Sequence, residues 1–426
     1  MKYQAPRGTF DILPEEIYRW HYLENIIKKN ANLYNYKEIR FPIFEQLELF
    51  QRSVGETSDI VEKEMYIFKD KAGRRFALRP EGTACIARAY IEHKMQASHR
   101  SPLRLFYLGP MFRYSRPQKG RYRQFYQFGF EYLGVPDPIA DAEIIALGWK
   151  IYQDTNIPNV RLEINSIGCP KCRKTYNEKL RTFLLKNKSL FCSDCQRRME
   201  VNPLRVFDCK RESCQNLLQE APTMLENLCE ECDVHFQTVQ NFLSEMEVPF
   251  TVNPRIVRGL DYYTRTAFEY KIDYLGAQDA IGGGGRYDDL IEQLGGPATP
   301  AVGLSGGLER VILSLKYGNV PIPPEPTLDA LVIPFDDSLL SPAIKICNTL
   351  HQKNISAVIA DPHSSLKSNL RYCDANQVKF AVIIGEDEIR SKKFIVKDIQ
   401  DKVQEAMPIP QISNYITQRI KNKKKL

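Results

Sequence analysis

The sequence lacks several features that mark common classes of protein. It contains no run of about 20 apolar residues, the length needed to cross a bilayer, so no membrane-spanning helix is expected. Its first ten residues, MKYQAPRGTF, hold no apolar segment of the kind that a secretory signal requires. Internal repeats are absent, and low complexity is confined to the final KNKKKL. We therefore expect a cytoplasmic globular protein.

Two familiar nucleotide-binding motifs are also missing. No segment fits the P-loop pattern G-x-x-x-x-G-K-[ST]. The glycine-rich AIGGGGRYDDL does not fit G-x-G-x-x-G, because Tyr287 occupies the position of the last glycine. Four consecutive glycines at the predicted end of a strand would instead let the backbone approach a flat or phosphorylated ligand. A nucleotide site in this chain would therefore belong to another class.

Acidic residues are missing from residues 101–130, although the net charge of the whole chain is only +7. This segment contains six basic residues, namely Arg104, Arg113, Arg116, Lys119, Arg121 and Arg123. Aromatic residues are interspersed with them along two predicted strands joined by a polar loop, which predicts an antiparallel hairpin. Because alternate strand residues face the same side, Arg113 and the loop cations can converge on one anion while a ring stacks on a base. The alternative is a solvated hairpin whose rings belong to the core, and the lack of any acid argues against it.

The last sixteen residues form a second segment without acids. Its basic residues are Arg419, Lys421, Lys423, Lys424 and Lys425. Two interpretations stay open for this tail: contact with a phosphate backbone, and a frayed end that keeps the protein soluble.

The remaining composition is that of ordinary globular domains, and 426 residues suffice for two or three of them. Residues 1 to about 165 mix helices and strands, whereas residues 169–248 lose their strand signals and gain cysteines, which predicts a helical insertion. The proline-rich VPIPPEPT predicts a linker. After it, apolar strands alternate with helices, which predicts a small, largely parallel sheet buried on both faces. The overall expectation is an α+β fold.

Two short segments combine charges, hydroxyl groups and aromatic rings. Glu81 and Thr83 lie where a predicted strand gives way to a helix, and together they suit an ammonium group. Taken alone, this pattern is explained better by Thr83 as a helix N-cap and Glu81 as a surface charge. The second segment, RGLDYYTR from Arg258 to Arg265, is denser in donors and rings than packing alone requires.

Eight of the eleven cysteines form four close pairs. They are Cys169 and Cys172, Cys192 and Cys195, Cys209 and Cys214, and Cys229 and Cys232. In a cytosolic chain such pairs are more typical of zinc than of disulfides. Reduced thiols packed in a helical insertion explain them equally well, so zinc binding stays open. The six histidines show no metal-binding spacing.

Taken in order, the motifs resemble the histidyl-tRNA synthetase family of class II aminoacyl-tRNA synthetases, in its bacterial form. They are APRGTFDILPEE, EIRFPIFEQLELF, LRPEGTACIARAYIEH, GPMFRYSRPQKGRYRQFYQFGFE, RGLDYYTRTAFEY and AVGLSGGLERVIL. The HIGH and KMSKS signatures of class I enzymes are absent. The resemblance implies a catalytic domain over residues 1–325, with an antiparallel sheet that holds ATP and the 169–248 insertion. It also implies an α/β anticodon-binding domain over residues 326–426, a homodimer, and histidine–tRNA ligase activity on L-histidine, ATP with Mg²⁺, and tRNA-His.

The resemblance also implies a role for individual residues. Arg258 and Arg113 would be catalytic, and Gln118 would approach the acceptor end of tRNA. The implied ATP-binding residues are Arg113, Arg121, Phe125 and Arg310. The implied histidine-binding residues are Glu81, Thr83, Gln127, Glu131, Arg258, Tyr262 and Tyr263. An imidazole has two distinct nitrogens, so a partner for each, here Glu131 and Tyr263, would distinguish it from isosteres. No metal ligand is implied among these residues.

Two rival interpretations are weaker. A histidyl-synthetase-like regulatory subunit of ATP phosphoribosyltransferase shares the catalytic fold, but its family pattern lacks the anticodon domain and the catalytic arginine. Here about 100 residues follow the linker, and Arg258 is present. A zinc-dependent nucleic-acid-binding protein without catalysis would leave the RGLDYY segment unexplained.

Overall fold

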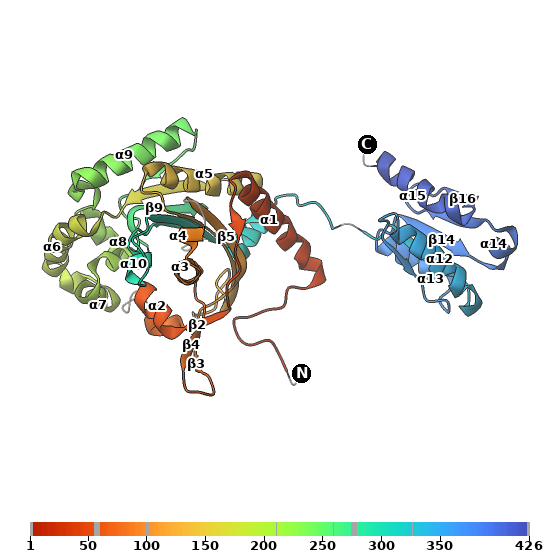
Figure 1. The fold of residues 1–426 in the computed structure, drawn as a ribbon, viewed down its shortest axis with the longest axis horizontal. Coiled ribbons are helices and arrows are strands. Elements are labelled where there is room, and N and C mark those ends of the chain that lie inside the picture. Colours follow the sequence, from red (N-terminus) through yellow and green to blue (C-terminus); the bar gives the residue numbers. More distant parts are fainter. Residues whose placement is uncertain are drawn as a thin grey trace. The chain divides into compact units, whose positions relative to one another are not determined.

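The computed structural model describes residues 3–54, 60–98, 102–209, 211–258, 260–273, 279–325 and 327–423. The chain divides into two compact units, Met1–Pro323 and Pro324–Leu426, each with its own hydrophobic core (Figure 1). The boundary between the units lies within the proline-rich run that predicted a linker, of which Pro326 lies outside the described residues.

An eight-stranded sheet forms the centre of the first unit, in the order β1-β5-β6-β11-β10-β9-β7-β8. The six inner strands pair antiparallel, whereas the short edge strands β1 and β8 pair parallel. The bounds are β1 (Lys37–Glu38), β5 (Leu103–Phe112), β6 (Gln124–Leu133), β7 (Arg161–Ser166), β8 (Thr251–Val252), β9 (Thr264–Lys271), β10 (Ala280–Arg286) and β11 (Ala301–Gly307). The predicted antiparallel sheet is confirmed.

Helices cover this sheet, and a second, three-stranded sheet in the order β2-β4-β3 adjoins its helices. The small sheet comprises β2 (Phe44–Gln46), β3 (Ile67–Lys69) and β4 (Arg75–Leu78). The helices are α1 (Pro14–Leu33), α2 (Leu47–Val54), α3 (Thr83–Glu92), α4 (Met95–Ser98), α5 (Pro138–Asp154), α10 (Leu290–Gln293) and α11 (Leu308–Tyr317). The helices predicted from Pro14 and from Thr83 are both confirmed.

The two faces of the large sheet bury different residues. On one face α1, α5 and α11 pack on a mainly apolar core, to which α1 contributes Trp20, Leu23 and Ile27 at three- and four-residue spacing (Figure 1). On the other face α3 packs over a core rich in tyrosine, including Tyr107 and Tyr287. The second face therefore combines burial with hydroxyl groups, as a binding site for a polar ligand requires.

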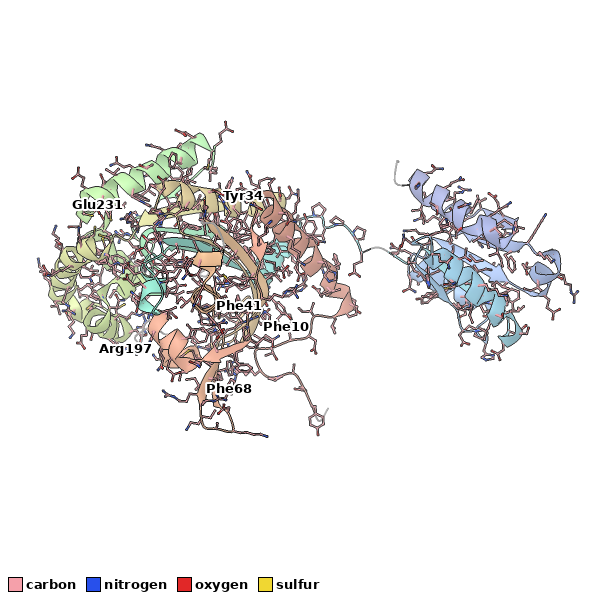
Figure 2. The ribbon with its side chains drawn as sticks, in the orientation of Figure 1. Phe10, Tyr34, Phe41, Phe68, Arg197 and Glu231 are labelled. Atoms are coloured by element: carbon pink, nitrogen blue, oxygen red, sulfur yellow. The ribbon has the colours of Figure 1, made fainter. Side chains whose placement is uncertain are left out.

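The insertion is helical throughout its described residues. It contains α6 (Pro170–Lys186), α7 (Ser193–Val201), α8 (Glu212–Leu217) and α9 (Glu230–Glu245), with 3₁₀ turns between them. Figure 2 labels Arg197 and Glu231 on its exposed surface. Five of the eight paired cysteines belong to the buried core of the insertion, namely Cys172, Cys195, Cys209, Cys214 and Cys232.

The C-terminal unit contains a five-stranded sheet in the order β13-β12-β14-β15-β16. The prediction of a largely parallel sheet holds for β13, β12 and β14 but is wrong for β15 and β16, which pair antiparallel. Only the links between the first three strands pass through full helices, whereas short connections turn the last strands back. The elements are β12 (Ala330–Pro334), α12 (Leu340–His351), β13 (Ala357–Ile359), α13 (Leu366–Ala375), β14 (Phe380–Ile384), α14 (Glu386–Ser391), β15 (Phe394–Asp398), β16 (Gln404–Met407) and α15 (Ile409–Lys423).

Part of the basic C-terminal tail is structured. Helix α15 extends to Lys423, whose Nζ lies 2.8 Å from Oδ1 of the buried Asp398. Arg419 pairs with Asp401 at 3.2 Å. A frayed end is therefore the wrong description for these two cations, while Lys424 and Lys425 lie outside the described residues.

Candidate active site

The hairpin of β5 and β6 brings the first site residues together. Its strands pair antiparallel from Leu103 opposite Leu133 to Phe112 opposite Gln124. Along β6, Phe128 and Phe130 point into the apolar core. Their neighbours in the strand therefore face the opposite, tyrosine-rich side, because successive strand residues alternate. This alternation places Gln127 and Glu131 on one face of the sheet.

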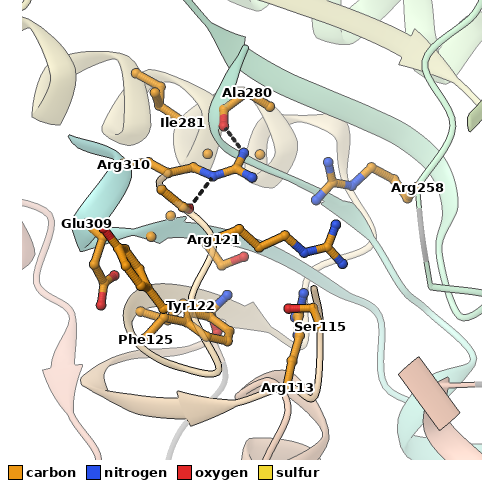
Figure 3. A pocket seen from close by; sticks show the side chains of 17 residues that line it. Arg113, Ser115, Arg121, Tyr122, Phe125, Arg258, Ala280, Ile281, Glu309 and Arg310 are labelled. Carbon is orange, nitrogen blue, oxygen red and sulfur yellow. Dashed lines mark hydrogen bonds between the residues drawn. The ribbon is translucent and has the colours of Figure 1, made fainter. Parts of the chain in front are cut away.

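A cavity of about 320 Å³ lies against this face (Figure 3). Its walls come from β6, β10, β11, the start of α11 and the loop between β5 and β6. Six of the predicted site residues line it, namely Arg113, Arg121, Phe125, Gln127, Arg258 and Arg310. They come from positions as far apart in the sequence as 113 and 310, so the fold itself assembles this part of the predicted site.

Four arginines direct their guanidinium groups toward this cavity (Figure 3). Backbone carbonyls hold two of them in place: Arg113 Nε donates to the carbonyl of Pro80 at 2.8 Å, and Arg310 Nη1 donates to that of Ala280 at 2.7 Å. Arg121 donates to Glu64 at 2.5 Å. Burial, followed by the charges of Arg121 and Arg113, lowers the pKa of Arg310. A bound polyanion would relieve this crowding of positive charge.

One wall of the cavity combines an aromatic ring with a carboxyl group. The guanidinium carbon of Arg113 lies 5.3 Å from the centre of the Phe125 ring. Next to Phe125, the N–H of Tyr126 donates to Glu309 Oε1 at 2.8 Å. Burial raises the pKa of Glu309 to about 7. This wall therefore offers an aromatic surface for stacking and a carboxyl group whose pKa lies near neutral pH.

Glycines form the floor of the cavity and allow charged side chains to lie flat on the sheet. A Cβ at Gly283, which lines the cavity, would come within 2.6 Å of the Phe268 carbonyl and 2.9 Å of Arg258 Nη1. Outside the cavity lining, a Cβ at Gly303 would come within 2.1 Å of Glu131 Oε2. The predicted position of the glycines at a strand end is wrong. All four lie inside β10, which pairs on both sides with β9 and β11.

Beyond the cavity lining, Glu131 anchors a buried polar cluster. Thr83 donates to its Oε1 at 2.7 Å, and the hydroxyl of Tyr287 donates to its Oε2. Burial raises the pKa of Glu131 to about 8. The cluster therefore holds a carboxyl group that accepts two hydrogen bonds and is protonated near neutral pH.

Glu81 belongs to the same region but has local partners. Its carboxylate accepts the N–H groups of Thr83 at 2.6 Å and Ala84 at 2.8 Å, so it caps the start of α3. Gly82, and not Thr83, is the N-cap residue. Burial raises the pKa of Glu81, and the neighbouring Arg113 is among the groups that lower it again. Glu81 is therefore a buried group and not the surface charge of the simpler interpretation.

The RGLDYY segment connects the cavity with the buried cluster; its Gly259 lies outside the described residues. Arg258 Nη1 donates to Glu269 Oε1 at 2.8 Å, and its guanidinium lies 5.4 Å from the centre of the Tyr263 ring. The rings of Tyr262 and Tyr263 are 4.7 Å apart, and Tyr262 also meets Tyr287 at 5.7 Å. A continuous set of contacts therefore runs from the arginine-lined cavity to Glu131.

Comparison with known proteins identifies this arrangement. The family described as Histidyl-tRNA synthetase matches residues 8–172 and 197–311, and the family described as Anticodon binding domain matches residues 329–419. The Desulfitobacterium hafniense protein named histidine–tRNA ligase is 45% identical over 421 residues, 99% of both chains. The one from Moorella thermoacetica is 46% identical over 410 residues, 96% of this chain and 97% of the relative. The solved structure of apo S. aureus histidyl-tRNA synthetase has a TM-score of 0.83 and 38% identity, and covers 97% of this chain and 99% of that one. The chain belongs to the histidyl-tRNA synthetase family.

Membership of the histidyl-tRNA synthetase family confirms the predicted resemblance and the predicted fold class. The antiparallel catalytic sheet, the helical insertion and a C-terminal anticodon-binding domain all occur in the expected order. Among the described residues, none of the helices combines the length and apolar character needed to span a membrane.

Several residues of this candidate site were not found from the sequence. Tyr287 was considered only as a departure from a glycine motif, although its hydroxyl reaches Glu131. Tyr107 donates to Gln127 Oε1 at 3.0 Å, and Glu269 pairs with Arg258. Of these residues, only Glu309 could have been identified from its position in the sequence, because it precedes Arg310 and is the first acid after the strand. Gln118, in contrast, is exposed in the loop between β5 and β6 and lies outside the cavity lining.

Proposed function

We propose that this chain is a histidine–tRNA ligase. It activates L-histidine with ATP to histidyl-adenylate and pyrophosphate, and then transfers histidine to the 3′ end of tRNA-His. The observation that carries this proposal is the placement of four arginines around one cavity, in contact with the buried Glu131 cluster. The arginine-lined cavity suits a triphosphate, and the Glu131 cluster suits a small ring with two nitrogens.

The arginine-lined cavity is the proposed ATP site. Phe125 stacks on the adenine, as aromatic side chains do with bases. Arg113 contacts the α-phosphate, and Arg121 and Arg310 hold the γ-phosphate end. The lowered pKa of Arg310, caused by burial and by the neighbouring arginines, supports an anionic ligand at this position. The glycine floor leaves room for the ligand against the sheet.

The buried cluster is the proposed histidine site. Glu131 and Tyr263 take the two imidazole nitrogens, while Glu81, Thr83 and Gln127 receive the α-ammonium group, and Tyr262 closes the pocket. A buried carboxyl group that must find a partner discriminates strongly against side chains that offer none. The raised pKa of Glu131, caused by burial, supports a site that holds a polar ring away from water.

Arg258 lies where the two sites meet, and we assign it the central catalytic role. In the activation step a histidine carboxylate oxygen forms a bond to the α-phosphorus, and the bond to the leaving pyrophosphate breaks. Two anions approach each other in this step, so a fixed cation between them lowers the barrier. Glu269 orients Arg258 through the 2.8 Å hydrogen bond. Arg113 stabilises the α-phosphate charge from the opposite side.

ATP is a substrate of the family's reaction, and we propose that Mg²⁺ accompanies it. Mg²⁺ usually binds through one or two carboxylates together with phosphate oxygens. Glu309 fits this requirement, since it lines the cavity and offers a carboxylate there, one oxygen of which accepts the Tyr126 N–H. When bound, the ion would neutralise charge on the phosphates. With the ion bound, Glu309 would be ionised near neutral pH, whereas without the ion its carboxyl group is about half protonated there.

The tRNA partner involves both units. We propose that residues 1–325 form the catalytic domain, in which Gln118 approaches the acceptor end of tRNA-His. Residues 326–426 form the anticodon-binding domain, a division that the family match at 329–419 supports. The family also supports a homodimer, and we propose that the enzyme charges tRNA in the cytoplasm. A regulatory subunit of ATP phosphoribosyltransferase is less well supported, because its pattern has no counterpart of the anticodon-binding match.

The decisive experiment is ATP–pyrophosphate exchange with the purified full-length chain. Exchange should depend on L-histidine and stay at background with the other amino acids, which serve as controls. Absence of histidine-dependent exchange in correctly folded protein would contradict the proposed activity. Exchange with several amino acids would instead contradict the assignment of the Glu131 cluster.

A further inference from the structure

The eight paired cysteines assemble into two clusters of four. The outer cluster joins the first and last pairs, and the inner cluster joins the two pairs between them. In each cluster all four Sγ atoms lie within 4.8 Å of one another. The outer cluster consists of Cys169, Cys172, Cys229 and Cys232, and the inner cluster consists of Cys192, Cys195, Cys209 and Cys214. The spacing of the cysteines in the sequence did not reveal this division, because the outer cluster joins the first and last segments of the insertion.

Three of the four pairs have the same local geometry. Cys169, Cys192 and Cys229 are the N-cap residues of α6, α7 and α9, each with extended backbone. The second cysteine of each pair lies in the first turn of the same helix, so both sulfurs sit at the helix start. The positive end of a helix dipole favours a thiolate there. The repetition indicates that the sequence builds sulfur ligands at these positions, beyond the needs of packing.

The distances between sulfurs fit a single tetrahedral ion. An ion about 2.3 Å from each of four thiolates places any two sulfurs about 3.8 Å apart. The outer cluster has Sγ separations of 3.6 Å between Cys169 and Cys172 and 3.9 Å between Cys169 and Cys229. The inner cluster has 3.9 Å between Cys192 and Cys209. An iron–sulfur cluster needs its cysteines further apart, because several irons and sulfides lie between them.

Backbone donors and burial complete both clusters. The N–H of Cys229 donates to Cys172 Sγ at 3.1 Å, and that of Cys192 donates to Cys214 Sγ at 3.5 Å. Donors of this kind stabilise metal-bound thiolates. All eleven cysteines of the chain are free of disulfides. An all-sulfur tetrahedral site, closed and partly buried, is typical of structural zinc.

We propose that the insertion binds two structural zinc ions, one in the outer cluster and one in the inner cluster. The insertion has a small core in which cysteines occupy five buried positions, so metal ligation supplies stability that apolar packing does not. The family match breaks between residues 172 and 197, and the first inner pair lies in that gap.

The outer ion would lie at the point where the insertion meets the active site. Arg173 follows the ligand Cys172, and its guanidinium donates to the carbonyls of Tyr263 and, at 3.3 Å, Ile167. At the end of α7, Asn202 donates to Asp261 at 3.1 Å, so the insertion touches the RGLDYY segment twice. The proposed zinc ions thus hold the framework against which that segment packs.

The first test is the metal content of the full-length chain, purified without chelator and without added metal. Elemental analysis should find two zinc ions per chain. A value below half an ion, a value of one, or iron in place of zinc would each overturn the proposal. This measurement is independent of enzymatic activity, so it separates the metal proposal from the ligase proposal.

The second test removes one ligand from each cluster. Cys229→Ser and Cys192→Ser replace half-buried N-cap residues, and serine is itself a good N-cap, so the helix start is preserved. After dialysis against EDTA each variant should hold one zinc ion while the wild type holds two. The matched control is Cys347→Ser, a buried cysteine of the C-terminal unit, which should keep two ions. Loss of zinc from the control, or none from the variants, would overturn the assignment.

A third measurement does not depend on the folding of variants. Co²⁺ added to the metal-stripped wild-type chain should produce the visible absorption of tetrahedral cobalt thiolate, saturating at two ions per chain. Saturation at one ion, or a spectrum without thiolate coordination, would contradict the two-site arrangement.

Discussion

The catalytic sheet and the cysteine insertion hold their buried polar groups in opposite ways. In the sheet, Glu131 receives hydrogen bonds from Thr83 and Tyr287, which are 48 and 156 residues away in sequence. Both donors belong to the protein itself, so Glu131 has these partners before any ligand arrives. In the insertion, the paired thiols gather in two clusters, and in each cluster the four sulfurs lie within 4.8 Å of one another. Glu131 therefore has hydrogen-bond donors within the protein, whereas we propose that a metal ion between the sulfurs holds the thiols of the insertion.

This difference teaches where each region is vulnerable. A substitution in the sheet removes a single contact from a framework that stays in register. Removing what binds the four sulfurs of a cluster would release two helix starts together. We therefore expect the sheet to lose function without losing its fold, and the insertion to lose its fold first. The following predictions test that contrast, beginning with the largest expected effect.

Arg258→Ala should reduce histidine-dependent exchange by at least about 10²-fold, because the cation between the two reacting anions is lost. The unfolding midpoint should change little. The matched control is Arg161→Ala, which removes a half-exposed arginine at the start of β7 in the same sheet. Near-normal exchange in Arg258→Ala would remove this residue from its catalytic role.

Removal of residues 326–426 should leave exchange within about twofold of the full chain and reduce tRNA charging by more than about tenfold. Exchange should persist because the two units have separate hydrophobic cores. Charging should fall because the lost tRNA contacts lower the affinity for tRNA, by a factor of ten for about each 1.4 kcal/mol of binding free energy. Both rates should be measured on the same preparation. An equal loss of both activities would mean that the C-terminal unit serves the catalytic unit structurally.

Glu131→Gln should raise the KM for histidine on the order of tenfold and leave the KM for ATP unchanged, because it alters one partner of the imidazole ring. Glu163→Gln is the matched control, since Glu163 lies on the same sheet but pairs with Lys271. Parallel changes in both KM values would contradict the division between the ATP and histidine sites.

The same variant should change how stability depends on pH. Burial raises the pKa of Glu131 from 4.5 to about 8, so ionisation costs the folded state more than the unfolded one. Its contribution to the free energy of unfolding is therefore lost as pH rises through 8. The free energy of unfolding, measured with urea at pH 6 and pH 9, should fall less between these pH values for Glu131→Gln than for the wild type, by on the order of 1 kcal/mol. An equal fall in both proteins would place Glu131 in contact with water.

Deletion of residues 421–426 should have the smallest effect. Its removal of Lys423 leaves Asp398 without that ion pair, and because the Lys423 side chain is itself partly exposed, the C-terminal unit should lose about 1 kcal/mol of stability. Affinity for tRNA at low salt should stay the same. Deletion of residues 424–426 alone keeps Lys423 and is the matched control. Weaker tRNA binding in both deletions would assign the tail to the phosphate backbone instead.

The sequence alone predicted those parts of the molecule that depend on local pattern or on ordered motifs. The hairpin of β5 and β6 followed from strand alternation and a polar loop, and α1 followed from apolar spacing after Pro14. Arg113, Arg121 and Arg310 were identified by resemblance, and the fold places all three around one cavity.

The remaining parts depend on contacts between distant segments. Tyr287 and Glu131 are 156 residues apart in the sequence, so their hydrogen bond could be predicted only if the order of the strands were known. Four glycines looked like a strand end because they lack side chains, whereas close pairing on both sides is what requires them. The division of the cysteines into outer and inner clusters could not be read from spacing, since all four pairs have similar short intervals.

The nested order of the cysteine clusters has a consequence for the time course of folding. Cys192 and Cys209 of the inner cluster are 17 residues apart, whereas Cys172 and Cys229 of the outer cluster are 57 apart. Closing the longer loop costs about 1 kcal/mol more in chain entropy, so the inner cluster should form first. Once it has formed, the loop that the outer cluster must close is effectively shorter. The base of the insertion, next to Tyr263, would thus be the last part of this region to assemble and the first to open.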